Sequence, residues 1–244
     1  MTTRAEFFAR IRTEMRKTSG LFAATVAERP RNPGVLVETV RRELAERWPE
    51  TVERFRLEFE RVGGVFHRAE RVAAVPALVA AIARQCSART LVAWHPTALG
   101  SDLGGPLTRE GLDVRAMPWG PVEERERQAL RAVVAAADVG LTGADLAVAE
   151  TGSLIVRSGP GRPRSTSLLP PCHVAVFDRT KLVESLAQVG LVLEAWHEGA
   201  SAFGANVSVI TGPSRTADIE LTLTRGVHGP KEVHAVFVEE ELGG

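Results

Sequence analysis

The sequence predicts an α/β protein with a mainly parallel sheet covered by helices on both faces, preceded by an N-terminal helical appendage. Two features predict this fold. From residue 63 onward, short apolar runs alternate with helical stretches, an order that builds a parallel sheet through crossover connections. Before that point, apolar residues recur at helical spacing. We therefore expect a helical region over residues 1–62 and an α/β domain over residues 63–244.

The composition limits the function classes. The chain has 244 residues, 44% of them hydrophobic, and a formal net charge of zero. Nucleic-acid binding needs a concentrated basic face, so this charge balance argues against a nucleic-acid partner. No apolar run approaches the roughly 18 residues of a membrane helix, and the N-terminus lacks a secretory signal. We expect a cytoplasmic protein with no membrane insertion.

The cysteines and histidines predict no metal and no bound cofactor. Cys86 and Cys172 are the two cysteines of the chain, too few for a four-thiolate iron–sulfur site, and no C-x-x-C pair occurs. The six histidines are too scattered for a motif such as H-E-x-x-H, and no dinucleotide fingerprint is present. We expect two reduced thiols.

The first helical region begins with an amphipathic segment. Phe7, Ile11 and Met15 are four residues apart, and the other face is rich in Arg and Glu. Mixed charge favours docking on the domain or on a second subunit over membrane contact. A turn-rich break at residues 29–34 precedes a second helical region over residues 35–62.

That second helical region is expected to be interrupted near Pro49, and Val52, Phe55 and Phe59 share one face of it. Beyond it, the expected strands are residues 65–67, 90–94, 113–117, 154–157, 173–177, 206–211 and 233–238. The expected helices are residues 70–84, 123–137, 179–188 and 216–225.

Three loops beside expected strands are candidates for a site, because ligands bind beyond the carboxyl ends of parallel strands. The first follows the sixth expected strand. Gly212 allows a sharp turn, and Ser214 and Thr216 can cap the next helix. Arg215 beside free helix amides would suit a carboxylate or phosphate. The alternative is a well-capped helix with Asp218 placed for its dipole.

The second candidate loop comprises Glu150, Thr151, Gly152 and Ser153. Glu150 among small residues can act as a base, a nucleophile or a hydroxyl ligand. The alternative is a turn whose Glu is solvated or paired with Arg157 or Arg164.

The third candidate loop leads into the strand that begins near His173, and Pro170 and Pro171 fix the direction of entry. An imidazole there can titrate usefully, although a single histidine is more often a hydrogen-bonded structural residue. The same alternatives hold for His228 in its tight Gly-Pro turn.

Taken together, these segments resemble the LutC/YkgG lactate-utilisation family, whose shared unit is the LUD domain. The resemblance rests on residues 150–153, 167–173, 211–220 and 226–230, covers roughly residues 55–240, and is strong from Asp145 onward. It implies a fold similar to the NagB/RpiA/CoA-transferase-like group and to 5-formyltetrahydrofolate cyclo-ligase. It also implies a role in oxidation of L-lactate to pyruvate, beside two partner proteins that bear the cysteine-cluster iron–sulfur centres.

We therefore expect a non-cluster subunit of a lactate oxidation system that binds a small carboxylate or phosphate. Glu150 and His173 are the candidate catalytic residues. The candidate ligand-binding residues are Thr151, Gly152, Ser153, Gly212, Ser214, Arg215, Thr216, Asp218 and His228. One pocket is expected to contain Glu150, His173, Ser214, Arg215 and His228. The alternatives are an independent CoA-transferase- or cyclo-ligase-like enzyme using Glu150, and a structural assembly subunit.

Overall fold

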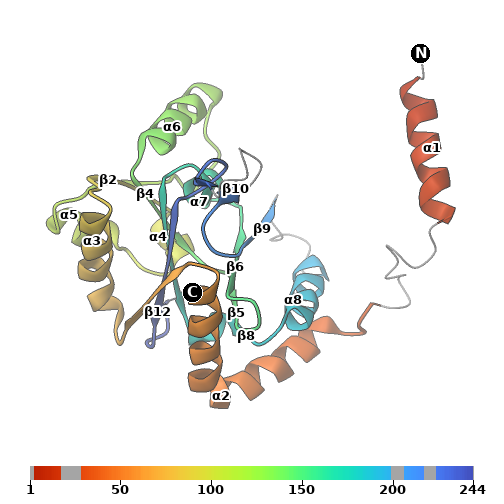
Figure 1. Cartoon of the computed structure of the whole chain (residues 1–244), viewed down its shortest axis with the longest axis horizontal. Helices are drawn as coiled ribbons and strands as arrows, with labels where there is room; N and C mark the ends of the chain where they lie inside the picture. The colour runs from red at the N-terminus through yellow and green to blue at the C-terminus, as the bar shows by residue number, and fades with distance from the viewer. Residues whose placement is uncertain (1–2, 18–28, 199–205, 217–223, 244) are drawn as a thin grey trace.

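A six-stranded, fully parallel sheet forms the centre of the protein, in the order β1-β12-β7-β4-β2-β3. The computed structural model describes residues 3–17, 29–198, 206–216 and 224–243. The strands of this sheet are β1 Val65–Ala69, β2 Thr90–Ala93, β3 Asp113–Ala116, β4 Val139–Gly143, β7 Cys172–Asp178 and β12 Glu232–Val238. The predicted mainly parallel α/β fold is confirmed (Figure 1).

A second sheet of four short strands lies beside the first, in the order β8-β5-β6-β9. Its strands are β5 Leu146–Val148, β6 Ser153–Arg157, β8 Leu182–Val183 and β9 Val207–Ile210. β6 pairs antiparallel with both β5 and β9. The prediction that residues 154–157 and 206–211 belong to the parallel sheet is therefore wrong. A four-residue turn joins β5 to β6, and so short a connection can join only antiparallel strands.

The helices are α1 Arg4–Lys17, α2 Pro33–Arg61, α3 Val75–Gln85, α4 Pro96–Leu99, α5 Gly104–Arg109, α6 Glu124–Ala136, α7 Ser165–Leu168 and α8 Leu186–Glu198, with short 3-10 turns η1 Val72–Ala74 and η2 Arg179–Lys181. The helix expected over residues 179–188 is wrong for most of its length. Asp178 accepts a hydrogen bond from the Thr180 amide and caps a single turn. The following apolar pair then forms β8 beside β5, and the helix begins only at Leu186.

The helix expected over residues 216–225 is also contradicted at both of its ends. Strand β10 Arg215–Thr216 pairs antiparallel with β11 Thr224–Arg225. Arg215 therefore does not lie at a helix start. Asp218 falls outside the described residues, so its expected role stays a prediction.

Helices cover both faces of the parallel sheet. Successive residues of each strand point to opposite faces, so apolar side chains on both faces need to be buried. On one face, Val79 and Ile82 of α3 pack in a cluster with Val236 of β12. On the other face, Phe55 and Phe59 of α2 pack against aromatic residues of β7 and β12. The second half of α2 is thus part of the core.

The expected interruption of the helix near Pro49 is wrong, because α2 is continuous from Pro33 to Arg61 and contains Pro49. Figure 1 shows that α2 changes direction along its length, which is the effect expected of an internal proline. The predicted amphipathic helix at the N-terminus is confirmed as α1. Phe7, Phe8 and Ile11 of α1 are exposed, and Figure 1 shows α1 apart from the domain. Docking of α1 on a second subunit stays a prediction.

Among the described residues, no helix combines the length and the apolar character needed to cross a bilayer.

Candidate functional site

A cavity of about 470 Å³ opens at the carboxyl edge of the parallel sheet, where β2 and β4 end. In open parallel sheets this edge is where ligands bind. The lining residues come from α2, α4, α8 and η2, from strands β4, β5 and β6, and from the segments that follow β2, β4 and β6. They are Arg41, Trp94, Ala98, Gly143, Ala144, Asp145, Leu146, Arg157, Arg162, Thr180, Lys181 and Trp196.

Asp145 organises the polar wall of this cavity. Its side chain is 9% exposed, and it occupies the junction between β4 and β5. The carboxylate accepts hydrogen bonds from the Arg157 amide at 2.7 Å, from Arg157 Nε at 3.0 Å and from Arg162 Nη1 at 3.1 Å. One buried carboxylate thus holds two guanidinium groups at the cavity wall.

Positive charge exceeds negative charge around the cavity. Of the residues that the structure describes, four basic side chains and one acidic side chain, that of Asp145, line it. Arg41 also pairs with Glu38 at 3.0 Å near the exposed rim. The Lys181 ammonium group has no hydrogen-bond or ion-pair partner among the described residues, so it is available to a ligand. The arrangement suits a small anion.

The apolar wall contributes two tryptophans. The Trp196 ring lies 3.7 Å below the Arg157 guanidinium and fixes its orientation by a cation–π contact. Trp94 is 2% exposed, and its indole N–H has no hydrogen-bond partner within the described segments. A buried donor without a partner costs free energy, so an acceptor atom supplied by a ligand would stabilise the site.

A smaller cavity of about 90 Å³ adjoins the first and shares Ala98, Gly143, Ala144 and Lys181 with it. It continues along the carboxyl edge toward β7 and the C-terminal segment at Leu242.

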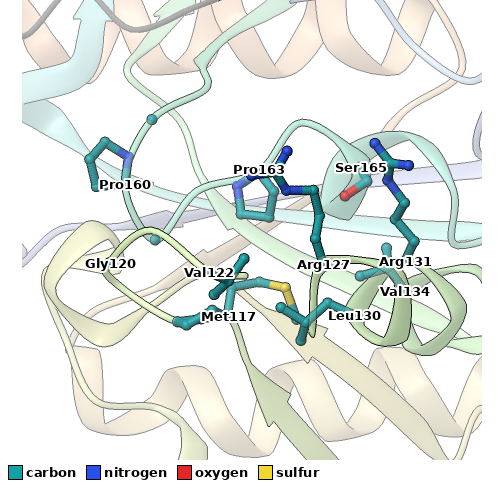
Figure 2. Close-up of a pocket in the computed structure, with 13 residues that line it drawn as sticks. Met117, Gly120, Val122, Arg127, Leu130, Arg131, Val134, Pro160, Pro163 and Ser165 are labelled. Atoms are coloured by element: carbon teal, nitrogen blue, oxygen red, sulfur yellow. The ribbon is translucent and has the colours of Figure 1, made fainter. Parts of the chain in front are cut away.

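A separate pocket of about 320 Å³ lies between α6 and the loop before α7 (Figure 2). Its floor is apolar, with Met117, Leu130 and Val134, and Arg127 and Arg131 rise from α6 beside it. Within the described parts of the chain, no carboxylate or histidine of the kind expected at a catalytic centre lines it.

The predicted Glu150 loop lies at the far end of the β5–β6 hairpin from the cavity. The hairpin leaves the cavity at Leu146 and returns to it at Arg157. Glu150 is exposed, and its Oε2 accepts a hydrogen bond from the Leu186 amide at 2.9 Å, which caps the start of α8. The Glu150 carboxylate therefore has a structural role, as the cap of α8.

Other predicted residues meet at the end of α2. Ser153 Oγ lies 2.7 Å from both Thr151 Oγ1 and Thr211 Oγ1. Gly152 and Gly212 both have positive φ, and a Cβ on either would lie 2.3–2.4 Å from α2 backbone or the Val62 carbonyl. Close approach to α2 explains why both positions are glycine.

Arg215 donates a hydrogen bond from Nη2 to the Val62 carbonyl oxygen. The Ser214 amide donates to the Pro230 carbonyl at 2.9 Å, which holds this loop to the turn that contains the exposed His228. Thr216 pairs with Thr224 in the short β10–β11 ladder. Two of the three loops that the sequence selects, at residues 151–153 and 211–216, are brought together, but around the end of α2.

His173 lies in the interior of β7 and is fully buried. Its Nε2 is 2.8 Å from Thr142 Oγ1, and burial lowers its pKa to about 3, so the ring is neutral at physiological pH. The expected single pocket does not match this arrangement, because His173 is enclosed in the sheet and Glu150 caps α8 at the surface.

Sequence reasoning missed Trp94, Asp145, Arg157, Arg162 and Lys181 as site residues. A usable signal was present at two of them. Trp94 is the last residue of an expected strand and precedes His95 and Pro96, and Asp145 begins the segment of strong resemblance.

Comparison with known proteins assigns the chain to a protein family. The model of the LUD domain matches residues 52–238. The chain is 32% identical over 160 residues to lactate utilization protein C of Halalkalibacterium halodurans, covering 65% of this chain and 66% of that protein. It is 35% identical over 136 residues to lactate utilization protein C of an Exiguobacterium species, covering 52% of this chain and 59% of that protein. The matches thus span about two thirds or less of these relatives.

Among solved structures, a DUF162 family protein from Deinococcus radiodurans superposes with a TM-score of 0.54. The alignment has 21% sequence identity and covers 78% of this chain and 98% of the other. At this identity the likeness shows a shared fold.

Proposed function

The chain belongs to the LUD domain family, and on that basis we propose that it is a lactate utilisation protein C-like subunit that binds a small carboxylate or phosphate at the carboxyl-edge cavity. The observation that carries this proposal is the surplus of basic side chains around Asp145 in that cavity. The names of the relatives support the lactate context.

The anion would be held by Lys181 and by the two arginines that Asp145 orients. Arg157 and Arg162 keep donors in a fixed geometry because Asp145 and, for Arg157, Trp196 hold their guanidinium planes. Lys181 would supply a compact charge from η2. A planar carboxylate pairs well with a guanidinium fork, and this chemistry suits lactate, pyruvate or a phosphate group.

We propose that iron–sulfur partner proteins carry the electrons from lactate. Two cysteines cannot ligate a four-thiolate cluster, so such clusters would belong to other chains. We place the role in the cytoplasm as part of the same proposal, which the free thiols Cys86 and Cys172 support. The rival of an independent enzyme using Glu150 has no support from its surroundings, because that carboxylate caps α8.

Growth on L-lactate tests the proposal. Bacterial cells that lack their own lactate utilisation protein C, but keep its partners, should grow on L-lactate when they express this chain. Lys181→Ala should abolish that growth, while Lys231→Ala, an exposed lysine outside the cavity, should support it. Equal growth of the Lys181→Ala and wild-type strains at equal protein levels would contradict the role of the cavity.

A further inference from the structure

A cluster of potential metal ligands lies at the opposite edge of the parallel sheet from the anion cavity. Cys172 is the first residue of β7, His234 is the third residue of β12, and Cys86 follows the last turn of α3. One ligand atom from each of these three residues lies within 4.8 Å of the other two. Cys172 and His234 are 3% and 2% exposed, and Cys86 is partly exposed.

Glu232, the first residue of β12, lies against this cluster from the solvent side. Its Oε2 is 3.5 Å from Cys86 Sγ and 3.4 Å from His234 Nε2. The two sulfur atoms are 3.5 Å apart, far longer than the roughly 2.05 Å of a disulfide bond. Glu232 and Cys172 are register partners on the two adjacent strands, which fixes the backbone of this corner.

Three of the six separations among these four residues are close to the edges of a zinc coordination tetrahedron, and the ligand atoms of Cys86, Cys172 and His234 all lie within 4.8 Å of one another. With Zn–S near 2.3 Å, Zn–N near 2.05 Å and Zn–O near 2.1 Å, tetrahedral angles place two sulfurs about 3.8 Å apart. The same geometry gives about 3.6 Å from sulfur to oxygen and about 3.4 Å from nitrogen to oxygen. The corresponding distances in the protein are 3.5, 3.5 and 3.4 Å.

An independent observation points to a ligand at this cluster. His234 Nε2 is buried and has no hydrogen-bond partner among the described residues. The nearest carboxylate oxygen, Glu232 Oε2 at 3.4 Å, is too distant for a good hydrogen bond. The other ring nitrogen, Nδ1, is engaged at 3.0 Å by His67 Nε2. A proton on Nδ1 that is donated to His67 leaves the Nε2 lone pair free to bind a metal.

We propose that Cys86, Cys172 and His234 bind one zinc ion, with Glu232 as the fourth ligand and His67 orienting His234. Two thiolates and one imidazole are the ligand types that select zinc among the common divalent ions. The thiols release two protons on binding, and the divalent cation neutralises the two thiolates. Glu232 adds its charge on the solvent-facing side. The ion would tie the end of α3 to β7 and β12.

Cobalt titration of the full-length, reduced protein tests the site, because Co²⁺ reports thiolate coordination by its visible and near-ultraviolet absorption. One equivalent of Co²⁺ should bind with a tetrahedral thiolate spectrum, and one equivalent of Zn²⁺ should displace it. Cys86→Ser and Cys172→Ser should each abolish that spectrum. His228→Ala, which removes an exposed histidine outside the cluster, should leave it unchanged.

His67→Gln separates an orienting role from coordination. It should lower Co²⁺ affinity roughly 10–100-fold while the stoichiometry stays at one ion per chain. If Cys172→Ser fails to fold, the partly exposed Cys86 still decides the matter, because Zn²⁺ should slow alkylation of Cys86 in the wild-type protein more than about tenfold. Absence of a saturable one-to-one Co²⁺ complex overturns the proposal, as does a Co²⁺ spectrum that survives Cys86→Ser.

Discussion

At the scale of single residues, the role of a charged side chain depends on its hydrogen-bond partners within the fold. Asp145 and Arg215 both carry charge beside a strand end, yet Asp145 organises two arginines at the cavity and Arg215 binds the carbonyl of Val62. From the sequence, Arg215 could bind an anion or pair with Asp218 or Glu220, both of which lie outside the described residues. The spacing of a loop does not reveal which distant backbone it meets. Contact with the end of α2 favours the internal role.

Removing Asp145 should destabilise the fold and loosen the cavity. Asp145→Ala removes the carboxylate that accepts hydrogen bonds from both guanidinium groups, so the free energy of unfolding should fall by about 1–3 kcal/mol. Urea denaturation measures this, with Asp113→Ala, an exposed aspartate at the sheet edge, as the control. Equal stability of Asp145→Ala and wild type would show that the arginines do not depend on it.

Arg215→Ala should lower stability without a defect in anion binding. The variant loses one hydrogen bond between an exposed guanidinium and a backbone carbonyl, worth about 1 kcal/mol. A melting curve and a phosphate titration on the same sample separate the two effects, and Arg125→Ala on the exposed face of α6 is the control. Unchanged melting with weakened phosphate binding would restore Arg215 as a ligand.

At the scale of elements, tertiary contacts can require residues that weaken the local strand pattern of the sequence. Within the parallel sheet, the sequence predicted β1, β2, β3, β7 and β12, because their apolar runs are bounded by turn residues. It missed β4, a central strand, because glycine at two of its five positions weakens the strand pattern. Gly140 is needed there because a Cβ would lie 1.9 Å from the Thr166 carbonyl of α7. That requirement comes from packing against α7, and the spacing of apolar residues in the sequence does not reveal it.

The β5–β6 turn should tolerate no side chain at Gly152. This position has φ +59°, and a Cβ would lie 2.3 Å from the Phe59 amide nitrogen. Gly111 has φ +93° with nothing within 4 Å, so Gly111→Ala isolates the backbone strain. Gly111→Ala should cost about 1 kcal/mol, and Gly152→Ala a further 1–3 kcal/mol or so, measured by urea denaturation. Equal losses for the two variants would mean that the turn can move away from α2.

At the scale of the whole molecule, the two edges of the parallel sheet carry different chemistry. The carboxyl edge opens into the basic cavity, and the amino edge of β7 and β12 holds the Cys–His cluster. The sequence identified the family resemblance and the fold class, but the residues it selected do not line the carboxyl-edge cavity. It assumed that residues 154–157 run in the parallel sheet, whereas the antiparallel β5–β6 hairpin carries the Glu150 turn away from the carboxyl edge.

Calorimetric titration of the cavity with small anions tests the central claim most directly. L-lactate, pyruvate or inorganic phosphate should bind the wild-type protein with one site per chain. Lys181→Ala should weaken that binding about 10–100-fold, since a hydrogen bond to a charged group is worth about 1.5–3 kcal/mol. Lys231→Ala, outside the cavity, should bind as wild type does. Failure of all three anions to bind, or equal affinity in the Lys181→Ala protein, would contradict an anion site at the carboxyl edge.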